Sequence, residues 1–188
     1  MKKLIAGAMT TVAVGAMVPL LVAAPASADA QAKVCTPGST KISWPSAAKR
    51  QILTHGVARN ASAPGTVTVG LRMVARVWAN VSGPAQPSAV IASLGKQTGT
   101  KLAPNKKATP GTLSATAKIT PGKTIFYAGT TKASGKYEAR TCNSKGTGYG
   151  TAKKGQAVSW TKLTKGAINC KTKVVNNPLA SAAQAKFC

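Results

Sequence analysis

The chain has 188 residues, and 26 lysines and arginines stand against two acidic residues and one histidine, which gives a formal net charge of +24 at pH 7. Few groups are therefore available for acid–base catalysis, and internal salt bridges can relieve little of the repulsion among the cations. A small domain needs a net charge of only about 2–8 to stay soluble. The composition predicts either an anionic polymer as partner or an adaptation for solubility and retention at a cell wall.

Residues 1–28 have the pattern of a cleavable secretory signal peptide. The positive segment Met1–Lys3 precedes the uncharged stretch Leu4–Ala24, and an Ala-Ser-Ala sequence ends at Ala28. A membrane anchor is the alternative, since about 20 apolar residues can span a bilayer. Pro19 interrupts the stretch and no basic cluster follows it, which favours cleavage.

Cleavage removes two lysines and leaves a formal charge of +22. The mature protein of about 160 residues has the length of one domain. No later segment is long and apolar enough to span a membrane. We expect a secreted, extracellular protein, with retention at the cell wall as a further possibility.

The N-terminal part of the mature chain is predicted to be extended and to lead into one domain. Residues 29–45 show no regular period and end at a Trp-Pro pair, whereas residues 46–188 are expected to form a single disulfide-bonded β domain. Ser46 could cap a short helix over residues 46–55, with a strand as the alternative.

Short strands alternate with turn signals through the rest of the chain. The clearest alternation of apolar and polar residues runs from Thr66 to Asn80. A hairpin turn around Ala133-Ser134-Gly135 is predicted to join two strands. The other expected elements, in chain order, are a strand at 88–94, a basic loop at 95–111, a strand at 113–119, hairpin strands at 124–131 and 137–142, strands at 158–163 and 167–175, and a helix at 178–186.

This pattern predicts an all-β fold, an antiparallel β-sandwich or barrel-like domain with a short C-terminal helix. Four cysteines remain after cleavage, and in an oxidising compartment an even number predicts two disulfides. Three pairings are possible for Cys35, Cys142, Cys170 and Cys188. The wide cysteine spacing, without C-x-x-C, and the single histidine argue against a metal site.

Catalytic residues are scarce, and no catalytic motif is present, so we expect no enzyme activity, no catalytic site and no cofactor. The only enzymatic alternative is a secreted ribonuclease that uses Glu138, Arg140 and His55, with acid, base and phosphate-binding roles. Gly146, Gly148 and Gly150 do not form a phosphate-binding motif, because the next glycine and a following helix are missing.

The lysines carry the binding hypothesis. Lysine is a point charge without the planar fork of arginine, so a lysine-rich surface recognises charge density more than shape. That favours cell-wall polymers, nucleic acid or acidic polysaccharide as partners, bound electrostatically at or outside the cell surface. The predicted contacts are Lys101, Lys106, Lys107, Lys132, Lys136, Lys145, Tyr149, Lys153 and Lys154, with Tyr149 expected to be exposed among glycines. The second alternative is a cationic antimicrobial or toxin that acts on anionic envelopes. The sequence points to no particular protein partner.

Overall fold

The computed structural model describes residues 33–103 and 108–188, and the segment Lys33–Cys188 forms one compact unit. The predicted signal peptide lies outside the described residues. The elements are β1 (Thr40–Ala61), β2 (Gly65–Met73), β3 (Asn80–Ser82), α1 (Pro87–Thr98), β4 (Leu113–Ile119), β5 (Gly122–Thr141), β6 (Lys153–Trp160), β7 (Thr164–Asn169) and α2 (Pro178–Phe187).

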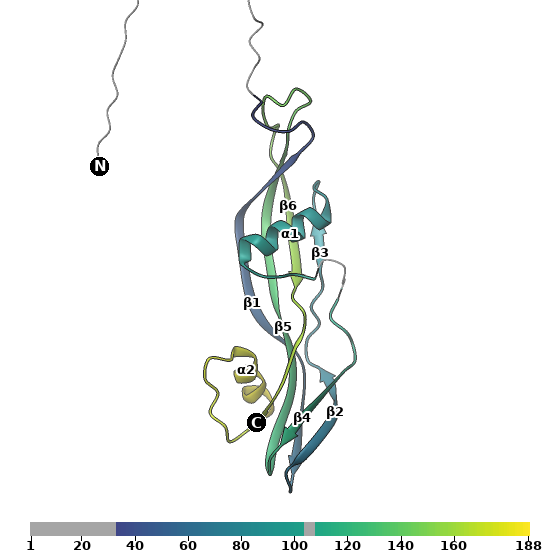
Figure 1. The fold of residues 1–188 in the computed structure, drawn as a ribbon, viewed down its shortest axis with the longest axis vertical. Coiled ribbons are helices and arrows are strands. Elements are labelled where there is room, and N and C mark those ends of the chain that lie inside the picture. Colours follow the sequence, from purple (N-terminus) through teal and green to yellow (C-terminus); the bar gives the residue numbers. More distant parts are fainter. Residues whose placement is uncertain (1–32, 104–107) are drawn as a thin grey trace, which may run out of the picture. The chain divides into compact units, whose positions relative to one another are not determined.

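Two long antiparallel strands, β1 and β5, organise the sheet. They pair from Thr40 opposite Thr141 to Ala61 opposite Gly122, over 22 and 20 residues respectively. Strands of 3–10 residues are usual, so this ribbon is long enough to join two parts of the fold. Figure 1 shows β1 and β5 side by side, with the other strands attached at either end.

The remaining strands extend the ribbon into an antiparallel sheet with the order β3-β6-β5-β1-β2-β4, in which β7 also pairs with β5. Strand β6 lies beside the C-terminal half of β5, and β7 lies beside its N-terminal half. Strand β2 joins β1 only at His55 and Gly56, and then pairs with β4 along its length. The sheet is not closed. The predicted all-β class, with antiparallel pairing, a short C-terminal helix and two disulfides, is confirmed.

The predicted helix at 46–55 is wrong, because these residues belong to β1. Ser46, which we expected to cap a helix, lies beside a bulge in the ladder, and its Oγ accepts a hydrogen bond from the Lys136 amide at 3.4 Å. Pairing with β5 overrides the local helix preference of the two alanines that follow. The extended N-terminal segment therefore enters the sheet at Thr40, before its predicted end at residue 45.

The predicted hairpin at residues 133–135 is also wrong, because β5 runs through it without a turn. Gly135 is present for a different reason. A Cβ atom there would overlap the carbonyl oxygen of Ser46 and contact the ring of Trp44 at 3.0 Å. The glycine thus permits close approach of β1 to β5 rather than a positive φ.

The predicted strand at 88–94 is a helix, α1. Pro87 starts it, Val90, Ile91 and Leu94 are buried at helical spacing, and Gly99 ends it with φ 60° and a backbone hydrogen bond to Gly95. Because α1 extends to Thr98, the basic loop begins later than residue 95. The strand predicted at 66–80 is shorter too, since β2 ends at Met73.

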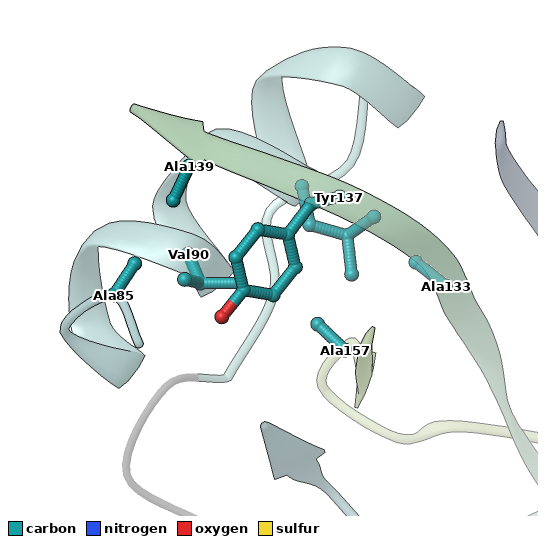
Figure 2. Close-up of a cluster of buried hydrophobic side chains, with 7 residues drawn as sticks. Ala85, Val90, Ala133, Tyr137, Ala139 and Ala157 are labelled. Carbon is teal, nitrogen blue, oxygen red and sulfur yellow. The ribbon is translucent and has the colours of Figure 1, made fainter. Parts of the chain in front are cut away.

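Both helices cover the same face of β5. The odd-numbered Ala133, Tyr137 and Ala139 pack against α1 through Val90 and Leu94. Figure 2 shows the Tyr137 ring among alanine and valine side chains of this cluster. Further along β5, two more odd-numbered residues, Ile125 and Tyr127, pack against α2. The even-numbered Phe126 and Ala128 pack against β2 and β4 on the other face. The even-numbered residues of the C-terminal half of β5 therefore form a face that α1 does not cover.

Two disulfides fix the ends of the unit. Cys35 pairs with Cys142, which holds the N-terminal segment to the end of β5, and Cys170 pairs with Cys188, which holds the end of α2. Among the described residues, none of the helices has the length and apolar character needed to cross a membrane.

Candidate polyanion-binding face

Among the described residues, six basic side chains lie along residues 132–140 of β5 and their partners on β1 and β6, on the face of the sheet opposite α1. Residues directly opposite each other in an antiparallel ladder share a face, as do residues two apart on one strand. Arg50 lies opposite Lys132, and Lys41 lies opposite Arg140. We call this group the cationic face: Lys41, Arg50, Lys132, Lys136, Arg140 and Lys154.

The centre of the cationic face is hollowed by small side chains. Ala48 lies opposite Ser134 on β5, which in turn lies opposite Val158 on β6. Two adjoining cavities of about 430 and 340 Å³ share Lys136 and Gln156 as lining residues. Lys132 and Arg140 are eight residues apart on β5, so the face extends about 26 Å along the strand. A linear polymer can lie along this length and contact cations at both ends.

The cations of this face have little internal compensation. Glu138 is the only acidic side chain among the described residues, because Asp29 lies outside them. No salt bridge of 4.0 Å or less joins Glu138 to a basic side chain of the described ranges. In each of the pairs Lys41–Arg140 and Arg50–Lys132, two positive charges therefore lie directly opposite each other. Facing like charges destabilise a sheet. An anionic ligand placed between such pairs would remove that repulsion.

Tyr149 borders the cationic face. It is 38 % exposed, as expected from its glycine neighbours, and Lys41 Nζ lies 5.9 Å from the centre of its ring. An isolated bridge between Tyr149 and Cys142 holds the ring beside the end of β5, and the Cys35–Cys142 disulfide anchors that position. The aromatic ring therefore lies beside Lys41 at the edge of the cationic face.

The predicted contact residues are only partly brought together. Lys132, Lys136 and Lys154 lie on the cationic face. Lys153 lies opposite Ala139 and so is on the side of the sheet that carries α1. Lys145 is exposed in the loop after β5. Lys101 is exposed in the segment after α1, and Lys106 and Lys107 lie outside the described residues.

Two basic residues of the cationic face could not be singled out from the sequence. Lys41 and Arg50 lie in segments that we expected to be an extended entry and a helix, and only their register with β5 reveals their role. The sequence suggests a role for Arg140 only in the ribonuclease alternative. Identifying these residues requires the pairing of β1 with β5, which the sequence does not reveal. That pairing joins residues about 80–100 positions apart in the chain.

Trp78 is exposed like Tyr149, but the sequence did not single it out. It is 58 % exposed, and the Arg76 guanidinium lies 4.6 Å from the centre of its ring. Arginine over an indole face is an attractive cation–π arrangement. Trp78 lies in the connection between β2 and β3, where it forms an isolated bridge with Ala108.

The residues of the ribonuclease alternative do not form one site. His55 lies opposite Ala128, whereas Glu138 lies opposite Ser43. Ten residues on β5 separate these two positions, which corresponds to about 33 Å along the strand. Glu138 and Arg140 share a face, but His55 cannot exchange a proton with a substrate bound there.

His55 is instead a buried residue at a bulge of β1. Its side chain is fully buried, its Nδ1 lies 3.0 Å from Thr54 Oγ1, and its Nε2 has no hydrogen-bond partner within the described residues. Burial lowers the pKa of His55 below its ordinary value, and backbone groups of Pro110 and Gly111 oppose this shift without forming a well-aligned hydrogen bond to Nε2. The ring is therefore neutral near pH 7.

The described residues contain no cluster of three or more histidine, cysteine or acidic side chains that could hold a metal ion. A scan against models of known protein families and a search of curated proteins found no match to this chain.

Proposed function

We propose that this protein associates electrostatically with an anionic polymer at or outside the cell surface, through the cationic face. The observation that carries the proposal is the placement of Lys41 opposite Arg140 and of Arg50 opposite Lys132. Lys41, Arg50 and Arg140 are exposed, and Lys132 is half-buried. Such pairs lower the stability of the free protein. Stability alone would favour a neutral residue at one position of each pair, so the arrangement is best explained by a ligand that carries negative charge.

The shape of the face supports a linear polymer. The cations are spread over about 26 Å of β5, and the small residues Ala48 and Ser134 leave room above the sheet between them. Lysine predominates in the chain as a whole, and it favours recognition of charge density over a base sequence. The proposed location outside the cell rests on the predicted signal peptide at residues 1–28.

Salt dependence of binding tests this proposal. The purified protein is titrated with inorganic polyphosphate, a single-stranded oligonucleotide and a neutral polysaccharide at about 50 and 200 mM salt. With six phosphate contacts, affinity should fall by about 10³-fold between these concentrations. No affinity for either anionic polymer, or binding that is independent of salt, would contradict the proposal.

A further inference from the structure

Glu138 lies on the same side of β5 as the cationic face, two residues from Arg140. It is directly opposite Lys154 across β5 and β6, and Lys136 lies two residues earlier on the same side of β5. All three residues line the cavity of about 430 Å³, together with Pro45, Ser82 and Gln156. One carboxylate and two ammonium groups therefore border a single cavity.

The carboxylate of Glu138 is not used in an internal ion pair within the described residues. Facing Cβ atoms in an antiparallel ladder are about 4.5–5.5 Å apart, so Lys154 can reach Glu138. No nitrogen–oxygen distance of 4.0 Å or less joins Glu138 to a basic side chain of the described ranges. The carboxylate and the two ammonium groups can therefore each interact with a charged group of a ligand bound in the cavity.

A carboxylate at this position opposes the binding of a purely anionic ligand. Like charges brought together at a binding site reduce affinity and select against the wrong partner. The charged side chains of the cationic face are all positive, so one acid among them changes which ligand binds best. A ligand with a positive group at this point would turn the repulsion into a charge-assisted hydrogen bond.

We infer that this cavity binds a repeating unit that carries both a phosphate and a primary amine. The phosphate would lie between Lys136 and Lys154, and the ammonium would donate to the carboxylate of Glu138. Ser82 and Gln156 add neutral hydrogen-bonding groups at the border of the cavity. Its volume lies within the range of small-ligand sites, about 300–1,000 Å³. This inference rests on the proposed function and narrows the partner to a zwitterionic phosphate polymer.

Two small probes that differ in the amine test the inference. Phosphoethanolamine carries a phosphate and an amine, and glycerol phosphate carries the phosphate alone. Each is titrated into the full protein, and binding is followed by changes in amide NMR signals. Wild-type protein should bind phosphoethanolamine about fivefold more tightly, as expected for one exposed ion pair.

The substitution Glu138→Gln should reverse this preference, because it removes the charge and keeps the size of the side chain. Phosphoethanolamine should bind about fivefold more weakly and glycerol phosphate more tightly. Asp29→Asn makes the same change in net charge at the only other acidic residue and serves as the matched control. It should leave the preference for phosphoethanolamine unchanged.

Three results would overturn the inference: equal binding of the two probes by the wild-type protein, no binding of phosphoethanolamine, or a gain in affinity for both probes in Glu138→Gln. Titration with inorganic polyphosphate in parallel shows whether only the inferred role of Glu138 fails or whether the proposed polyanion binding fails as well. If polyphosphate binds with a steep salt dependence while the probes fail to discriminate, only the role of Glu138 is wrong.

Discussion

Arg50 lies directly opposite Lys132 across β1 and β5, and both side chains are on the face of the sheet that α1 does not cover. The neighbouring residue, Lys49, lies opposite Ala133 and projects to the other face. Two adjacent basic residues of one strand thus have different electrostatic surroundings. This difference makes the cost of the cationic face measurable.

Replacing Arg50 with threonine should stabilise the free protein, because it removes a like-charge pair and introduces a residue that favours strands. We expect the free energy of unfolding to rise by about 0.5 kcal/mol at low salt and by less at high salt. Urea unfolding at both salt concentrations gives the measurement. Lys49→Thr is the control, and an equal gain in that variant would show that the facing pair has no particular cost.

The buried His55 predicts a loss of stability in mild acid. Its pKa is lowered by burial in the folded protein, so the unfolded chain binds the proton first as the pH falls. Stability should be fully present above the ordinary pKa of 6.5 and decline as the pH falls toward the lowered value. The slope should not exceed about 1.4 kcal/mol per pH unit.

His55→Gln tests the origin of this decline, since glutamine carries no titratable group. Acid unfolding usually reflects many carboxyl groups, but this chain has only two acidic residues. Urea unfolding of both proteins between pH 7.5 and 5 should therefore show a pH dependence in the wild-type protein that is much reduced in the variant. An unchanged slope would assign the decline to another group.

Adding a side chain at Gly135 should destabilise the fold by a steric clash, which would not be expected at a residue in a turn. A Cβ atom there would overlap the Ser46 carbonyl, so Gly135→Ala should lower the free energy of unfolding by about 1–3 kcal/mol. At Gly70 on β2, a Cβ atom would have no neighbouring atom within 4 Å, and Gly70→Ala should be neutral or slightly stabilising. Thermal unfolding of the two variants distinguishes them, and equal stability would mean that β1 can move away from β5 at no cost.

The Cys170–Cys188 disulfide should affect stability but not polymer binding. It closes a loop with a sequence separation of 18 residues at the end of α2, while the cationic face lies on the halves of β1 and β5 that pair near Cys35–Cys142. The double substitution of Cys170 and Cys188 by serine should cost about 3 kcal/mol. Its polyphosphate affinity below the unfolding temperature should equal that of the wild-type protein, and a loss would place part of the binding surface near α2.

Local patterns in the sequence were enough to predict part of the fold. The alternation of Val67, Val69 and Leu71 predicted β2, and an alanine-rich segment after Pro178 predicted α2. The four cysteines predicted two disulfides, although their pairing required the structure.

Where long-range pairing decides the structure, the sequence was misleading. Ser46 and Gly135 have the chemistry of a helix cap and a turn, yet they contact each other across β1 and β5. The candidate site depends on the same pairing. The sequence predicts contacts at Lys132, Lys136 and Lys154. It does not show that they share a face with Lys41 and Arg50, because that depends on the strand register, which no local pattern encodes.

The most direct test of the cationic face compares two triple variants with the same net charge. One replaces Arg50, Lys136 and Arg140 with serine, and the other replaces the exposed Lys118, Lys171 and Lys173, which lie on β4 and in the segment before α2. Polyphosphate affinity is measured against salt for both. We predict that the first variant loses most of its affinity and that its salt slope falls by about 2–3, while the control stays close to the wild-type protein. Equal losses in the two variants would contradict a localised site and show that the whole basic surface attracts the polymer.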